Sequence, residues 1–184
     1  MNHIYKIIFS FSEGYNFLNG QVCFEFRQLV PKVDYLEYLD QLCKDGRTTQ
    51  VPPLTKKTVK LAIDRDLLDL LQSCMDFVPE KFICNMAAEK GSLKVLQWAR
   101  TKGYPWNART CALAARCGHL EILQWARTNE CIWDEEVCAS AAEGGHLEIL
   151  QWLRTNGCPW YNWICVTMAN LQGHRHVSDW IKKN

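Results

Sequence analysis

Cysteines recur along this chain at a spacing of 27 residues, and a regular set of thiols invites a metal-binding or redox interpretation. Equivalent residues on stacked helices are separated by about 8–10 Å. A disulfide requires Cα atoms within about 7 Å, and a zinc–sulfur bond is only about 2.3 Å long. No Cys-x-x-Cys pair occurs. We therefore interpret these cysteines as small apolar core residues: Cys84, Cys111, Cys138 and Cys165.

The chain has ten cysteines in total, and we predict that all of them are free thiols and that no metal or cofactor is bound. Histidines recur at the same spacing, at His119, His146 and His174. They could act as metal ligands or general bases, or they could bridge neighbouring turns by hydrogen bonds. Recurrence in every unit favours the bridging role. The common nucleotide-binding, zinc-protease and nucleophile-elbow motifs are absent, so we predict no catalytic residues and no enzyme activity.

Tryptophans form two further recurring sets. The first is predicted to pack on helices and contains Trp98, Trp125, Trp152 and Trp180. The second falls in predicted loops, where tryptophan is either a lid over the core or an interface hot spot, and we favour the lid: Trp106, Trp133 and Trp160. Trp163 belongs to neither set, which makes it the better candidate for contact with a partner.

These residues all belong to one internal repeat. Residues 119–125 recur unchanged as residues 146–152, and residues 92–98 are a variant of the same segment. Three units are clear, a fourth is altered by one extra residue, and an eroded copy spans residues 58–79. Terminal repeats are often atypical because each has only one neighbour. The repeat therefore accounts for about two thirds of the chain.

Each unit reads as helix, tight turn, helix and loop. In the second clear unit, Asn107 is the expected N-cap, residues 108–115 form the first helix, and Gly118 closes it. The second helix is expected over residues 119–128. It carries two apolar faces, which only a stack of units can cover from both sides.

The pattern Ala-Ala-x-x-Gly-His-Leu-Glu-Ile-Leu, at residues 114–123 and 141–150, resembles the ankyrin repeat. With the Gly-Cys-Pro-Trp that follows at residues 157–160, it is similar to the short ankyrin repeats of giant DNA viruses and protists. The resemblance implies an all-α fold over residues 51–184, an ankyrin-type solenoid of stacked antiparallel helix pairs that binds a partner protein. The period is 27 rather than about 33 residues. Binding through long β-hairpin fingers is therefore not expected.

Residues 1–50 do not repeat and are expected to form a helical segment. Residues 21–30 resemble the last helix of an F-box, with Val22, Phe26 and Leu29 on one helical face. One alternative is an F-box-like segment that makes the chain a substrate receptor for a cullin-type ubiquitin ligase, with the ligase adaptor as a second partner. The other alternative is a helical cap on the first repeat.

The composition of the chain narrows the classes of function and cellular location that remain. The net charge is +1, and 48% of the residues are hydrophobic. The chain shows no basic stripe of the kind that is typical of nucleic-acid-binding proteins, so we do not expect nucleic acid as a partner. The chain has no convincing signal peptide, and it has no apolar run of the roughly 18–20 residues that a membrane helix needs. We expect a cytoplasmic monomer, in the host cytoplasm if the chain is viral.

Candidate contact residues follow from what the repeat does not preserve. The second helices of two units are identical over seven residues, whereas the first helices differ at particular positions. In an ankyrin stack these positions resemble those that line the concave face, although the alternative is that they are exposed sites under no constraint. With Trp163 added, the candidate set is Ala108, Arg116, Cys117, Glu135, Glu143, Asn162, Trp163 and Asn170.

Overall fold

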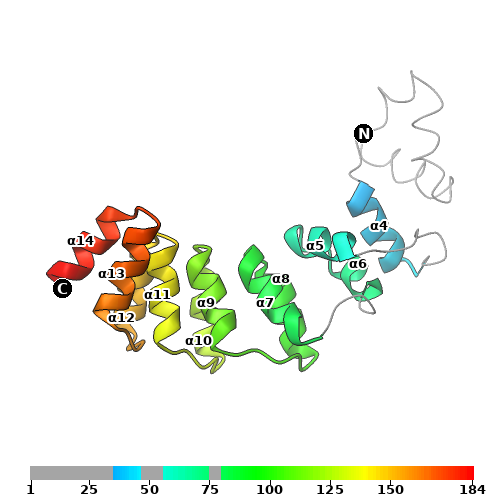
Figure 1. The fold of residues 1–184 in the computed structure, drawn as a ribbon. Coiled ribbons are helices and arrows are strands. Elements are labelled where there is room, and N and C mark those ends of the chain that lie inside the picture. Colours follow the sequence, from blue (N-terminus) through cyan, green and yellow to red (C-terminus); the bar gives the residue numbers. More distant parts are fainter. Residues whose placement is uncertain (1–34, 47–55, 75–79) are drawn as a thin grey trace, which may run out of the picture.

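The computed structural model describes residues 35–46, 56–74 and 80–184, and every regular element in these ranges is an α-helix (Figure 1). The all-α prediction is therefore confirmed for this part of the chain. Residues 21–30, with their F-box-like pattern, lie outside the described residues. In chain order the helices are α4 (Tyr35–Lys44), α5 (Lys56–Asp64), α6 (Leu68–Ser73), α7 (Glu80–Lys90), α8 (Leu93–Thr101), α9 (Ala108–Arg116), α10 (Leu120–Thr128), α11 (Glu135–Glu143), α12 (Leu147–Thr155), α13 (Asn162–Leu171) and α14 (Arg175–Lys183).

From residue 80 onward the helices form pairs that stack side by side. In each pair a first helix (α7, α9, α11 or α13) packs against the second helix that follows it. Each first helix also packs against the first helix of the next pair, so these four helices form a continuous row (Figure 1). No described helix has the length and apolar character needed to cross a bilayer.

Local sequence sets where the helices begin and end. The Asn107 side chain accepts a hydrogen bond from the Arg109 N–H at 3.1 Å, and the Thr110 hydroxyl oxygen accepts one from the Asn107 N–H at 3.3 Å. This reciprocal pair satisfies two N–H groups that the first turn leaves unpaired. After the helix, Gly118 adopts a φ of +86°, which residues with a Cβ rarely adopt. The Asn107 cap and the Gly118 turn were both predicted correctly.

The core lies between the helix pairs. Each second helix buries residues from both of its apolar faces; in α10 these are Ile122, Leu123 and Ala126. Leu120 and Trp125 are half-buried and pack against the same core. A single pair could not cover both faces, so burial depends on the neighbouring units.

The helices at the N-terminal end continue this packing. The eroded copy at residues 58–79 contains α6 and all but the first two residues of α5, and α5 packs against α7. The Asp64 carboxylate lies 3.1 Å from the Lys90 ammonium of α7. From the non-repeating segment, α4 packs on α6, and the Asp40 side chain accepts a hydrogen bond from the Leu70 N–H at 2.8 Å. The boundary at residue 50 therefore marks where the repeating sequence begins. It is not a gap in the packing, because α4 of the non-repeating segment packs against α6 of the repeat region.

One loop carries backbone strain that its neighbours avoid. Glu130 has a φ of +62°, whereas the equivalent positions are Gly103 and Gly157. We expect Glu130→Gly to raise the free energy of unfolding by about 0.5–1 kcal/mol, since relief of about 1–2 kcal/mol of strain exceeds the entropy cost of glycine. Urea unfolding measures the change in the free energy of unfolding, and the m-value should stay unchanged. Glu121→Gly, within α10, is the control and should destabilise by about 1 kcal/mol. A lower midpoint for Glu130→Gly would contradict the prediction.

Candidate functional site

The recurring histidines join consecutive units through the backbone. His119 Nε2 lies 3.3 Å from the carbonyl oxygen of Glu89, and His146 Nε2 lies 3.0 Å from that of Arg116. In the last unit His174 packs on Gly145, and His176 lies 3.2 Å from the Gly145 oxygen, whereas the counterpart of Glu89 and Arg116 is Glu143. The bridging role is therefore confirmed for His119 and His146, whereas in the last unit a different histidine, His176, bonds to a different carbonyl. Within the described ranges, no group of three potential ligands could hold a metal ion.

The loop tryptophans pack as lids over the core. The rings of Trp133 and Trp152 meet edge to face with centroids 5.8 Å apart. The guanidinium of Arg127, from α10 of the same unit, lies 4.3 Å from the Trp133 centroid, within cation–π range. Trp106 meets Trp125 edge to face in the same way, Trp160 lies at a tilt against Trp180, and an arginine lies over each of the two loop rings. These tryptophans are therefore engaged within the stack, as the lid interpretation predicted.

The buried thiols form contacts that the recurring spacing alone did not reveal. Cys111 Sγ lies 3.3 Å from Cys131 Sγ, a residue 20 positions later in the same unit. Cys131 also donates to the Asn107 carbonyl at 3.6 Å, so it links its loop to the start of α9. Burial raises the pKa of Cys84 and of Cys165 to about 11. Those two thiols are therefore protonated and weakly nucleophilic at neutral pH.

The candidate contact residues separate into two bands at opposite ends of α9, α11 and α13. We call Ala108, Glu135, Asn162 and Trp163 the loop-edge band, because they follow the loops between units. We call Arg116, Cys117, Glu143 and Asn170 the turn-edge band, because they precede the tight turns. A rise of 1.5 Å per residue places the two bands about 12 Å apart. Together they form what we call the first-helix face.

Exposure differs within each band. In the loop-edge band, Trp163 is 72% exposed, and Glu135 and Asn162 are also exposed, whereas Ala108 is half-buried. In the turn-edge band, Arg116 and Asn170 are exposed, whereas Cys117 and Glu143 are half-buried. The structure therefore places the predicted residues at the two ends of three neighbouring helices but not in one cluster.

Packing also constrains one position that looked variable. Gly144 is the counterpart of Cys117 in the next unit. A Cβ atom on Gly144 would overlap the carbonyl oxygen of Arg116 and lie 2.9 Å from its carbonyl carbon. Glycine is therefore required at residue 144 by the close approach of α11 to α9. The difference between Cys117 and Gly144 reflects this packing and is no evidence of partner contact.

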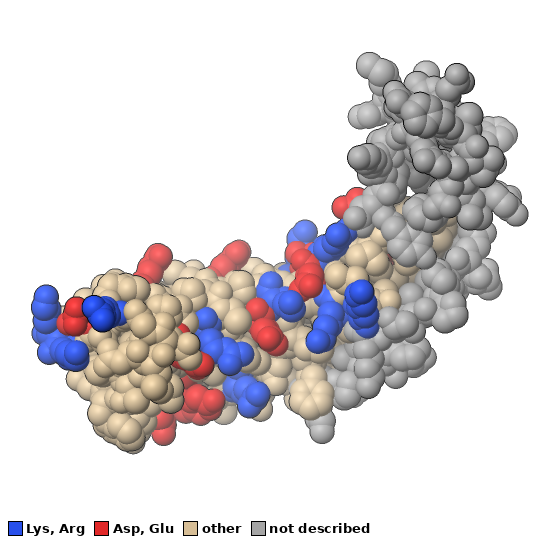
Figure 2. Space-filling view, turned by 45° about the horizontal axis from the view of Figure 1, so that its top comes forward, with Lys and Arg blue, Asp and Glu red and all other residues tan. Residues whose placement is uncertain are grey.

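Charge changes from helix to helix along the first-helix face. Arg109 and Arg116 make α9 basic, and Glu135, Glu136 and Glu143 make α11 acidic. None of these five forms an ion pair within 4.0 Å among the described residues. Helix α13 has no charged residue. Figure 2 shows charged side chains of both signs scattered over the described surface, including its C-terminal end.

Three exposed apolar side chains were missed by the sequence reasoning. Ile132 is 75% exposed, Tyr161 is 52% exposed and Phe82 is 47% exposed. A comparison of equivalent positions would have identified Ile132, because the neighbouring units have Pro105 and Pro159 there. Tyr161 likewise takes the place of the capping residues Asn107 and Asp134.

A comparison with models of known protein families finds no match for this chain, and a comparison with curated proteins finds no match either.

Proposed function

We propose that this chain is a protein–protein interaction scaffold built as an ankyrin-type solenoid, and that it binds a partner protein through the first-helix face. The contrast between framework and surface residues carries the proposal. The histidine, tryptophan and thiol contacts recur from unit to unit, because packing recurs. From α9 through α11 to α13, the exposed residues of the first helices change from basic to acidic to uncharged without pairing with one another, as expected for a surface that meets a non-repeating partner.

A second candidate adds a role for the N-terminal segment. The F-box-like pattern at residues 21–30 favours a substrate receptor of a ubiquitin ligase. The contact between α4 and α6 favours a direct structural connection from this segment to the stack. Affinity purification of the full chain distinguishes the candidates, since only the receptor should recover a ligase adaptor together with the bound protein.

The interaction is tested by charge reversal on both bands. We expect the combined variant Arg116→Glu, Glu135→Lys and Glu143→Lys to lower affinity for a purified partner at least tenfold, a loss of about 1.4 kcal/mol. Surface changes of this type usually alter stability by no more than about 0.5 kcal/mol each, so the fold should persist.

Glu148→Lys is the matched control, because Glu148 is exposed on the second helix α12. Its affinity should equal that of the wild-type chain. Isothermal titration calorimetry gives the affinities, and circular dichroism checks the fold. If a partner is found and the triple variant binds it as tightly as the wild type, the first-helix face is not the binding surface.

A further inference from the structure

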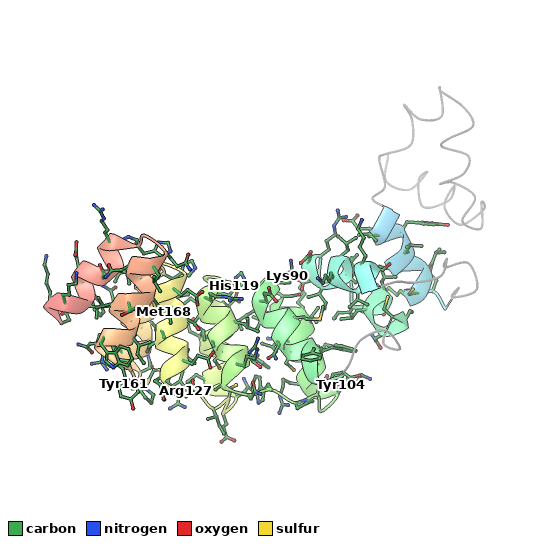
Figure 3. The ribbon with its side chains drawn as sticks, viewed as in Figure 1. Lys90, Tyr104, His119, Arg127, Tyr161 and Met168 are labelled. Atoms are coloured by element: carbon green, nitrogen blue, oxygen red, sulfur yellow. The ribbon has the colours of Figure 1, made fainter. Side chains whose placement is uncertain are left out.

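Three of the large exposed apolar side chains in the described residues lie at one edge of the stack. Ile132 is in the loop between α10 and α11, Tyr161 precedes α13, and Trp163 is in the first turn of α13. The loops between units lie along a common edge, where Figure 3 shows Tyr104, Arg127 and Tyr161. Helices α11 and α13 pack against each other, so the loops that precede them are neighbours. We call Ile132, Tyr161 and Trp163 the apolar loop surface.

Each of these residues departs from the pattern of its own repeat. Ile132 replaces a proline that could rigidify the loop. Tyr161 occupies the N-cap position of α13 and makes no capping hydrogen bond there. Its counterpart Asp134 accepts one from the Glu136 N–H at 3.1 Å. Trp163 replaces a charged, solvated residue, since Arg109 and Glu136 occupy the equivalent positions.

These departures do not serve the fold. Ile132 and Trp163 remain about three quarters exposed, so they contribute little to the core. Tyr161 forgoes a cap that helices favour. The same edge carries the strained backbone of Glu130, two residues before Ile132. Exposed apolar groups and local strain at one place are typical of a binding site.

Charge at this edge indicates the type of partner. Glu130, Glu135 and Glu136 are exposed around Ile132, and none of them has an ion pair within the described part of the chain. The nearby cations Arg127 and Arg154 are held over the Trp133 and Trp160 rings. An approaching segment therefore meets apolar side chains with an acidic border. Lysine or arginine would complement the border and could also stack on the exposed aromatic rings.

We propose that the apolar loop surface binds a linear protein segment in which aliphatic or aromatic residues are flanked by lysine or arginine. The inference rests on the proposed interaction function and specifies the chemistry of the partner. The acidic border gives the complex a specific orientation and a salt-dependent affinity. The apolar residues provide the contact that remains at high salt.

The test uses a random twelve-residue peptide library displayed on phage and selected against the full-length chain. Enriched sequences should combine apolar residues with lysine or arginine, and the synthetic peptides should bind more weakly as salt rises. The variant Ile132→Pro, Tyr161→Asn and Trp163→Glu replaces each residue with one that the chain already uses at the equivalent position. It should fold normally and lose at least tenfold in peptide affinity. Glu135→Gln with Glu136→Gln should reduce both the affinity and its salt dependence.

A turn-edge variant, Arg116→Glu with Glu143→Lys, is the control and should bind the selected peptides like the wild type. The proposal is overturned if no peptide is enriched, if the enriched peptides are acidic, or if the apolar-loop variant retains wild-type affinity. The proposed function is still supported after any of those results if a purified protein partner binds the turn-edge variant more weakly than the wild type. If a purified protein partner binds both sets of variants as tightly as the wild type, the proposed function is overturned instead.

Discussion

Replacement of Trp133 by alanine should lower the free energy of unfolding by about 3–5 kcal/mol, the range for removal of a buried tryptophan. Only 9% of the Trp133 surface is exposed. Its ring packs edge to face on Trp152 of the next unit and lies beneath Arg127 of its own unit. The substitution therefore leaves a cavity at the junction of two units and removes a cation–π contact. Urea unfolding followed by circular dichroism measures the loss.

Trp163→Ala is the matched control, because the same side chain is removed from an exposed position. Because 72% of the Trp163 surface is exposed, the substitution should change the free energy of unfolding by no more than about 0.5 kcal/mol. Equal losses for the two variants would show that Trp163 is part of the core, and would remove it from the proposed binding surface.

The fold was predictable wherever packing repeats. A contact that recurs from unit to unit requires the same residue type at the same spacing, so the roles of Gly118, His119 and His146 could be predicted from their positions. The helix boundaries followed closely: α9 ends at Arg116 rather than residue 115, and α10 begins at Leu120 with His119 as its cap. The signal for each of these features is the period itself.

Contacts between residues that are not one repeat apart were harder to predict from the sequence. The period pairs each cysteine with its counterpart in the next unit, and so it gives no sign of the contact between Cys111 and Cys131 inside one unit. In the last unit it is His176 of α14 that bonds to the preceding unit, at the Gly145 carbonyl, which a count of positions does not reveal. The thiol contact depends on how the loop folds back onto α9.

The candidate site was predicted in part for a related reason. Variation between units identified exposed positions such as Arg116 and Glu135, but variation also arises from packing, as at Gly144. The split into two bands, about 12 Å apart by the rise of a helix, follows from where each helix begins and ends. Tyr161 was overlooked because it lies in a loop, and only the first helices were compared for contact residues.

Gly144→Ala should be the most damaging of the single-methyl changes, with an expected loss of about 3 kcal/mol, at the upper end for overpacking. Gly144 has an ordinary helical φ of −76°, so alanine meets no backbone strain there. The new methyl group would instead overlap the Arg116 carbonyl oxygen and come within 2.7 Å of the His146 ring. Helix α11 would have to move away from α9, which would strain the bond from His146 to that same carbonyl, now 3.0 Å long.

Gly157→Ala separates this steric effect from the general cost of replacing glycine. Gly157 has a φ of +76°, and no atom lies within 4 Å of the point that an alanine methyl group would occupy. Alanine there should therefore cost about 1–2 kcal/mol through backbone strain alone. The two variants are compared by urea unfolding. A smaller loss for Gly144→Ala than for Gly157→Ala would mean that α9 and α11 separate easily at this point. In that case the spacing between Arg116 and Glu143 would be adjustable, and the turn-edge band would be shaped by its partner rather than preformed.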